Sequence, residues 1–142
     1  MPMEIRRILL DSMCRVMERT QHEGMAGLRK LYRSSPETIS DYVEMRKQFI
    51  GKTSTSESVE NMDLDLDQGT NLYTHVWFGG ISYEMDILDE KTHRFLFRDS
   101  GGTPELVVVV YLRYGGYGKE AAPVASQIAK KWKEIKKQNA EK

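Results

Sequence analysis

The sequence predicts an α+β protein in which helices come first, a mostly antiparallel sheet follows, and one further helix ends the chain. Two observations predict this order. Before residue 46 and after residue 121, apolar residues recur at helical spacing. Between residues 49 and 112, β-forming residues occur in alternating or unbroken apolar runs, which polar and glycine-rich stretches separate. Helices that are segregated from strands along the chain are typical of α+β domains.

Three helical segments are expected before the first strand. Residues 3–20 carry apolar side chains at helical spacing, and residues 28–32 indicate a further short turn. Ser35 is a suitable N-cap, and Pro36 suits the first turn of a helix that reaches about residue 45.

Three strands should follow. The first contains residues 52–55, and the second covers residues 72–83, where Gly79 and Gly80 suggest a bulge or a close backbone contact. Residues 106–112 are apolar throughout, as expected of a strand buried on both faces. An extra strand at residues 93–97 would make the sheet four-stranded. The closing helix covers about residues 121–138, with apolar positions at Val124, Ile128, Trp132 and Ile135.

Length and composition restrict the class of protein. The 142 residues suit a single domain, and 21 basic and 21 acidic side chains give a formal net charge of zero. This balance argues against a general nucleic-acid binder, so we expect no nucleic-acid partner. No apolar run approaches the roughly 18 residues of a membrane span, and no signal-peptide pattern opens the chain. A protein that works outside the cytoplasm would need its targeting segment elsewhere.

Several residues that could carry other chemistry have simpler interpretations. The single cysteine, Cys14, lies in a helical apolar pattern, which favours a buried thiol over a nucleophile. The three histidines show no metal-ligand spacing. Residues 63–69 resemble a calcium loop, but the glycine comes one position late and Thr74 stands where a bidentate Glu is needed. We therefore expect neither a metal nor a cofactor.

The most informative stretch is Lys52-Thr53-Ser54-Thr55, which follows an apolar entry and alternates like an edge strand. Such residues are common on solvated edges. Lys-Thr-Gly, however, is also a signature motif of the penicillin-recognising serine acyltransferases, in which it borders the active site. The choice between these interpretations depends on the segments that surround the motif.

Three further segments fall in the order found in that family. Residues 74–80 resemble its His-Ala-Trp-Phe-x-Gly strand, and residues 13–16 with 24–26 resemble the preceding helix and Gly-Thr-Ala turn. Residues 108–112, 115–118 and 121–125 resemble its last strand, glycine turn and C-terminal helix. From residue 4 to about 132, the chain resembles the C-terminal third of the transpeptidase domain of a class B penicillin-binding protein. Residues 1–142 would then be a single partial domain of a penicillin-binding, β-lactamase-like transpeptidase fold.

The resemblance implies a role for each motif residue. Lys52 would be the catalytic residue of this segment, acting in electrostatics and proton transfer near the nucleophile. Thr53, Ser54 and Thr55 would form the substrate-binding strand, with the threonine hydroxyls bound to the terminal carboxylate. The backbone N–H of Thr55 would provide half of an oxyanion hole. Ser54 departs from the usual Gly, and Met25 replaces the usual Thr of the upstream turn.

The catalytic part of the family pattern is missing. Neither Ser-x-x-Lys, which supplies the nucleophile and its base, nor Ser-x-Asn occurs in the 142 residues. The expected function is therefore that of a C-terminal fragment of a peptidoglycan D,D-transpeptidase, inactive alone, which supplies the substrate-binding strand for acyl transfer. The alternative is a non-catalytic interaction module that keeps a degenerate transpeptidase scaffold. A third interpretation, a free-standing domain with an unrelated small-molecule site, requires a deep pocket within the chain.

The resemblance also implies partners and location. Peptidoglycan stem peptides and β-lactams would bind only when the missing N-terminal part is supplied. The parent protein would work in the periplasm or on the extracytoplasmic face of the cell membrane. Family strands that neighbour residues 106–112 come from upstream of this chain, so this segment would become an exposed apolar edge. Self-association through residues 106–112 is therefore expected.

Overall fold

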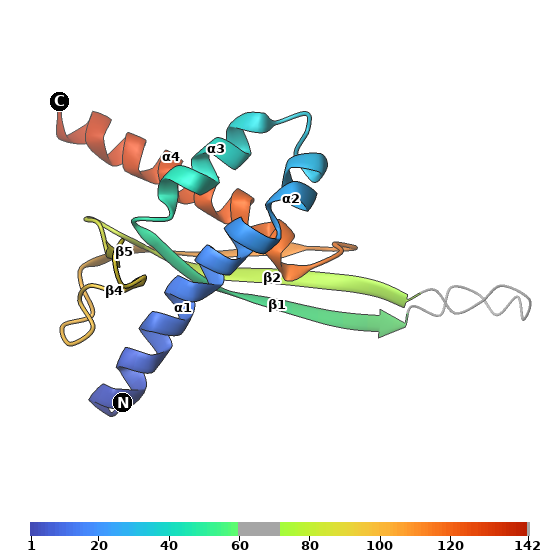
Figure 1. The fold of residues 1–142 in the computed structure, drawn as a ribbon. Coiled ribbons are helices and arrows are strands. Elements are labelled where there is room, and N and C mark those ends of the chain that lie inside the picture. The colour runs from blue at the N-terminus through green and yellow to red at the C-terminus, as the bar shows by residue number, and fades with distance from the viewer. Residues whose placement is uncertain (60–71, 142) are drawn as a thin grey trace, which may run out of the picture.

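The structure is a computed structural model that describes residues 1–59 and 72–141 (Figure 1). The predicted α+β organisation is confirmed. Three helices precede the main sheet, α1 (Met3–Glu23), α2 (Met25–Leu31) and α3 (Pro36–Met45). The single-turn helix η1 (Gly118–Ala121) and α4 (Ala122–Ala140) end the described chain. Pro36 lies in the first turn of α3, as its fixed φ favours.

The main sheet is antiparallel, with the order β1 (Phe49–Val59), β2 (Leu72–Tyr83) and β5 (Pro104–Leu112). In the described part of the chain, β2 is central and both β1 and β5 are edge strands. The sheet is three-stranded, as predicted, and the possible extra strand at residues 93–97 does not join it. That segment contains only β4 (Arg94–Phe95), which pairs with β3 (Leu88–Asp89) in a separate two-stranded hairpin.

One face of the sheet is covered by α3 and α4. The main hydrophobic cluster lies there, where Phe49, Phe78, Val108 and Val110 meet residues from α1, α2, α3 and α4. The ring of Phe78 occupies the space that a Cβ on Gly51 would need, and the ring of Phe49 does the same at Gly80. The close backbone contact expected at the Gly79-Gly80 pair therefore occurs at Gly80, whereas a Cβ at Gly79 would meet nothing within 4 Å.

A second cluster lies at one end of the opposite face. Here α1 and the β3–β4 hairpin enclose the side chains of Leu10, Cys14, Ile50, Tyr83, Ile87 and Phe95. Cys14 is buried, as the sequence predicts. Burial, aided by the nearby carboxylates of Asp11 and Glu18, raises the pKa of the Cys14 thiol to about 12. A neutral thiol at physiological pH is not a nucleophile.

The prediction that residues 106–112 are buried on both faces is wrong. Val108 and Val110 face the helices and are buried, whereas Val107 and Val109 lie on the open face and are 67% and 68% exposed. The apolar run is unbroken because both faces carry valine, although helices cover only one of them.

The packing of α4 also differs from what its large apolar residues suggest. Ala122, Ala125 and Ala129 are buried against the sheet, whereas Ile128, Trp132 and Ile135 remain 40–46% exposed. Small side chains let α4 lie close to the strands, and the large ones form a stripe on its flank. Among the helices that the structure describes, none is long and apolar enough to cross a membrane.

Candidate functional site

The four motif residues lie on β1, but their side chains are divided between two faces of the sheet. Side chains alternate along a strand, and directly opposed residues in an antiparallel pair share a face. Lys52 is opposite Gly79 and Ser54 is opposite Trp77, on the face that the helices α3 and α4 leave open. Thr53 is opposite the buried Phe78, so Thr53 and Thr55 lie on the other face. Only Lys52 and Ser54 are therefore neighbours on one face.

The pairing register determines which residues of β1 direct their N–H and C=O groups to β2 and which direct them to the outer edge. The N–H of Tyr83 donates to the carbonyl of Gln48 at 2.9 Å, and these two residues are directly opposed in the β1–β2 register. They form a hydrogen-bonded pair, and such pairs alternate with non-bonded ones along an antiparallel ladder. Lys52 and Ser54 consequently direct their backbone groups to β2. The N–H and C=O groups of Thr53 and Thr55 point to the free outer edge.

Lys52 lies at this outer edge. Its Nζ donates a hydrogen bond to the backbone carbonyl of Thr53 at 2.6 Å, and its side chain is exposed. The ammonium group therefore stands beside the outward-facing backbone groups of the motif. A strand edge with outward-facing donors and acceptors, one of them bonded to an adjacent ammonium group, can bind an extended peptide that ends in a carboxylate.

The glycine turn after β5 supports the motif from the covered side. The N–H of Gly118 donates to the Thr55 hydroxyl oxygen at 3.2 Å. A Cβ at Gly118 would lie 2.8 Å from the carbonyl oxygen of Ser54 and 2.9 Å from the Cβ of Thr53, so the close approach requires glycine. A hydroxyl that accepts one hydrogen bond keeps its own proton, and Thr55 can still donate it to a ligand. No local pattern predicts this contact, because its partners are 63 positions apart in the chain.

On the open face, aromatic side chains border Ser54. Trp77 and Tyr111 have ring centroids 5.0 Å apart, and the Tyr111 hydroxyl lies 3.0 Å from Nδ1 of His75. His75 is therefore part of a surface cluster on β2 and β5. Ser54 is exposed, and its Cβ is directed to this face and away from the outer edge of β1.

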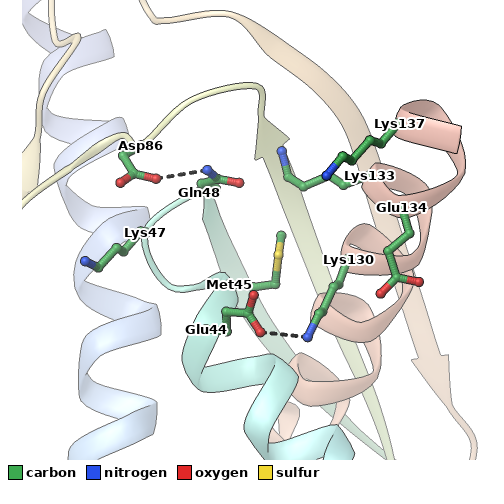
Figure 2. Close-up of a pocket in the computed structure, with 9 residues that line it drawn as sticks. All are labelled: Glu44, Met45, Lys47, Gln48, Asp86, Lys130, Lys133, Glu134 and Lys137. Carbon is green, nitrogen blue, oxygen red and sulfur yellow. Dashed lines mark hydrogen bonds and ion pairs between the residues drawn. The ribbon is translucent and has the colours of Figure 1, made fainter. Parts of the chain in front are cut away.

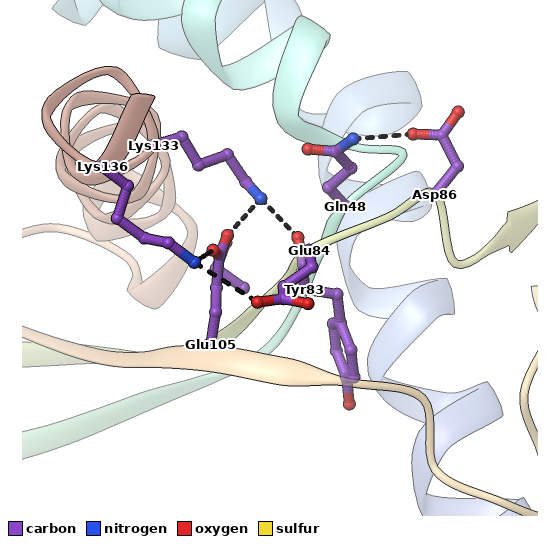
Figure 3. Close-up of polar contacts among 8 residues, drawn as sticks. Gln48, Tyr83, Glu84, Asp86, Glu105, Lys133 and Lys136 are labelled. Atoms are coloured by element: carbon purple, nitrogen blue, oxygen red, sulfur yellow. Dashed lines mark hydrogen bonds and ion pairs between the residues drawn. The ribbon is translucent and has the colours of Figure 1, made fainter. Parts of the chain in front are cut away.

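The depressions described next lie away from the motif. One of about 370 Å³ lies between α3, the start of β1 and α4, with side chains of both charge signs, among them Glu44, Lys130 and Lys137 (Figure 2). Lys130 already binds Asp41 and Glu44, each at 2.6 Å. A neighbouring depression is lined by Glu84, Glu105, Lys133 and Lys136, which form ion pairs with one another (Figure 3). Neither includes Lys52, Thr53, Ser54 or Thr55.

The ion pairs around Glu105 connect secondary-structure elements to one another. Lys133 binds the Glu105 carboxylate and the backbone carbonyl of Tyr83, and Lys136 binds Glu105 at 3.0 Å. Burial would raise the pKa of Glu105, but the hydrogen bonds from Lys133 and Lys136 outweigh it and hold the pKa below its usual value. The network joins α4 to β5 and to the end of β2.

Metal-binding groups are not found among residues 1–59 and 72–141, in which no three His, Cys, Asp or Glu side chains are placed to share an ion. The calcium-like residues 63–69 lie outside the described part. His93 makes an ion pair with Glu18 at 2.8 Å.

Comparison with known proteins gives no relative. No family model matches the chain, and no curated protein or solved structure matches it significantly.

Proposed function

We propose that the chain is the C-terminal part of a penicillin-binding peptidoglycan D,D-transpeptidase and supplies its substrate-binding strand. The observation that carries this proposal is the outer edge of β1. There the backbone groups of Thr53 and Thr55 point outward, and the Lys52 ammonium lies 2.6 Å from the Thr53 carbonyl. An extended stem peptide or a β-lactam can pair with this edge by strand addition.

The chemistry of the edge suits a peptide with a free terminal carboxylate. Lys52 supplies the positive charge, and the Thr55 hydroxyl retains its proton while it accepts the hydrogen bond from Gly118. The outward N–H of Thr55 has the direction that an oxyanion-hole donor needs. The parent enzyme would act on the extracytoplasmic side of the membrane, where its substrate lies.

The replacement of Gly by Ser54 is compatible with this role. The Ser54 side chain is directed to the open face, whereas the ligand would pair with the outer edge. A hydroxymethyl group at this position therefore does not obstruct the edge groups of Thr53 and Thr55. Acyl transfer still needs a nucleophile, and this sequence carries no Ser-x-x-Lys. The missing N-terminal part would be needed for tight binding and for acylation, and the chain alone would bind a stem peptide only weakly at the β1 edge, without reacting.

Binding can be tested on the chain as it exists. We expect a peptide that ends in D-Ala-D-Ala to shift the amide NMR signals of Thr53 and Thr55. Lys52→Ala should weaken this binding about 10-fold or more, because a hydrogen bond to a charged group is lost. The control variant Lys91→Ala removes an exposed lysine on the β3–β4 hairpin and should bind normally. The same peptide with an amidated C-terminus should bind as weakly as Lys52→Ala does. Equal binding of both peptides would contradict the proposed role of Lys52.

A second function remains an alternative because Ser54 and the two absent motifs would also suit a non-catalytic interaction module. Labelled penicillin distinguishes the two when a segment carrying Ser-x-x-Lys and Ser-x-Asn is supplied. If the supplied segment is acylated and Lys52→Ala abolishes this acylation, the result supports the transpeptidase function. Peptide binding without any acylation supports the module.

A further inference from the structure

We propose that β5 joins two copies of this chain into a two-fold symmetric dimer, in which the two β5 strands pair antiparallel about Val109. The two three-stranded sheets then form one continuous sheet. This inference concerns the edge opposite to the ligand-binding edge of β1. It applies to the chain without the upstream strands that the proposed parent enzyme would place on β5, and it does not use the ligand-binding residues of β1.

The outer edge of β5 carries backbone N–H and C=O groups that can pair with a further strand. The odd-numbered residues of β2 direct their backbone groups to β1, as the bond from Tyr83 to Gln48 fixes. The even-numbered residues of β2 therefore bond to β5, where they oppose even-numbered residues such as Val108 and Val110. The N–H and C=O groups of Val107, Val109 and Tyr111 consequently point to the free edge.

This edge lacks the protection that the other edge has. Natural edge strands are commonly blocked by lysine, proline or other charged residues. On β1, the charged Lys52 lies at the edge, hydrogen-bonded to the Thr53 carbonyl, where it discourages pairing with a strand that brings no negative charge. On β5, residues 106–112 carry no charge and no proline, and Val107 and Val109 are two-thirds exposed.

Two-fold symmetry and the number of outward-facing residues that find a partner together select the register. Two copies of β5 can form hydrogen-bonded pairs only between odd-numbered residues. Centring the axis on Val109 pairs Val109 with its own copy and pairs Val107 with Tyr111 of the other chain, so all three outward-facing residues are used. The antiparallel arrangement also keeps Arg113, which directly follows β5, far from its own copy, whereas a parallel arrangement would place the two side by side.

The stripe on α4 lies on the same side as this edge. Lys130 binds Asp41 and Glu44 of α3, so α3 lies on the Lys130 side of α4 (Figure 2). Ile128 and Trp132 are each two positions from Lys130, which places them about 160° around the helix from it. This flank faces away from α3. A two-fold axis perpendicular to the sheet keeps both α4 helices on one face and brings their two stripes toward each other across the axis.

A second copy suits this surface better than a lipid bilayer. The exposed N–H and C=O groups of β5 need hydrogen-bonding partners, and hydrocarbon provides none. A second β5 provides N–H donors and C=O acceptors at the spacing that the first strand needs. In a two-fold pair, each β5 covers the outer edge of the other.

The oligomeric state is the first test. Sedimentation of the full chain from about 1 µM to about 1 mM should reveal a monomer–dimer equilibrium. Val109→Lys places two like charges opposite each other and should raise the dissociation constant at least about 10-fold. The control variant Ile8→Lys makes the same change at an exposed residue of α1. Its dissociation constant should equal that of the original chain. Circular dichroism checks that both variants fold.

Cross-linking tests the register. Opposed hydrogen-bonded residues have Cα atoms about 5.5 Å apart, within the range of a disulfide. Val109→Cys should therefore form a covalent dimer on mild oxidation. The matched variant Val107→Cys should not, because the two copies of residue 107 lie about 14 Å apart in this register. The original chain is the negative control, because Cys14, its single cysteine, is buried and should not form a disulfide between chains.

Three outcomes would overturn the proposal. A chain that stays monomeric at about 1 mM has no such interface. Open-ended assembly would exclude a closed two-fold contact. Efficient cross-linking of Val107→Cys rather than Val109→Cys would exclude the register.

Discussion

At the scale of single residues, Glu105 is a buried carboxylate that hydrogen bonds from neighbouring side chains stabilise in its charged form. Its side chain is only 5% exposed, and its carboxylate accepts hydrogen bonds from Lys133, Lys136 and Ser82. A carboxyl whose pKa is lowered in the folded state stabilises the protein at pH values above its unfolded pKa, near 4.5. That contribution disappears as the pH falls through the lower, folded-state pKa.

Glu105→Gln should therefore lower the free energy of unfolding by about 2 kcal/mol at pH 7. The difference from the original protein should shrink as the pH falls below about 4, because a protonated Glu resembles Gln. Urea unfolding at pH 7 and at pH 3 measures both effects. Glu134→Gln is the control, since its exposed ion pair with Lys131 should be worth less than about 0.5 kcal/mol. A difference that does not change with pH would show that the carboxylate charge is not responsible.

The directions of individual backbone groups could not be predicted from the sequence. The pattern of residues 49–57 predicts a strand and, by alternation, which side chains share a face. Which of its amides point to β2 depends on the register, and the register depends on Gln48 and Tyr83, which are 35 residues apart in the chain. The Lys133–Glu105 pair is unpredictable for a similar reason, because no local pattern in the sequence identifies ion-pair partners on different elements.

At the scale of elements, η1 and the preceding glycine turn determine how close the chain comes to β1. Gly118→Ala would place a Cβ against the backbone of Ser54, and the atoms that must move belong to the strand itself. We expect a loss of about 1–3 kcal/mol in the free energy of unfolding and weaker binding of the D-Ala-D-Ala peptide. Thermal unfolding and the amide signal of Thr55 measure these changes.

Gly79→Ala serves as the control, because a Cβ there meets no atom within 4 Å. It should change stability by less than about 1 kcal/mol. If both variants were equally destabilised, loss of glycine from the sheet region, rather than the contact with β1, would explain the effect.

The helices and strands themselves were largely predictable, but their buried faces were not. Apolar periodicity predicts α4, and its largest apolar residues are Ile128, Trp132 and Ile135. The sheet instead accepts Ala125 and Ala129, because close packing of a helix on a sheet favours small side chains at the contact. Hydropathy alone does not say which of two apolar stripes has a partner. The same limit applies to β5, where Val108 is buried and Val109 is not.

At the scale of the whole molecule, two hydrophobic clusters lie on opposite faces of one sheet. Cys14 lies in the second cluster, between α1 and the β3–β4 hairpin, so the rate at which its thiol is labelled measures how tightly that cluster is packed. Since its pKa is raised from 9.0 to about 12, its thiolate fraction near pH 8 should fall about 10³-fold. We expect thiol labelling in the native state to be slower than in urea by at least that factor.

Phe95→Ala should open this cluster and speed the labelling of Cys14, with a loss of about 3–5 kcal/mol in stability. Leu96→Ala is the control, because Leu96 is 51% exposed beside it. Native labelling at the unfolded rate would contradict the packing of α1 against the sheet.

The aromatic rings over Gly51 and Gly80 have a consequence for sequence variation. Sliding β1 by two residues along β2 would keep every side chain on its own face. It would also press the Phe78 ring against Thr53 or Phe49 in place of Gly51. Steric exclusion by two phenyl rings thus fixes where Lys52 stands along the sheet. Gly51 and Gly80 touch no ligand in the proposed function, yet substitutions there should be tolerated as poorly as substitutions of the lysine that they position.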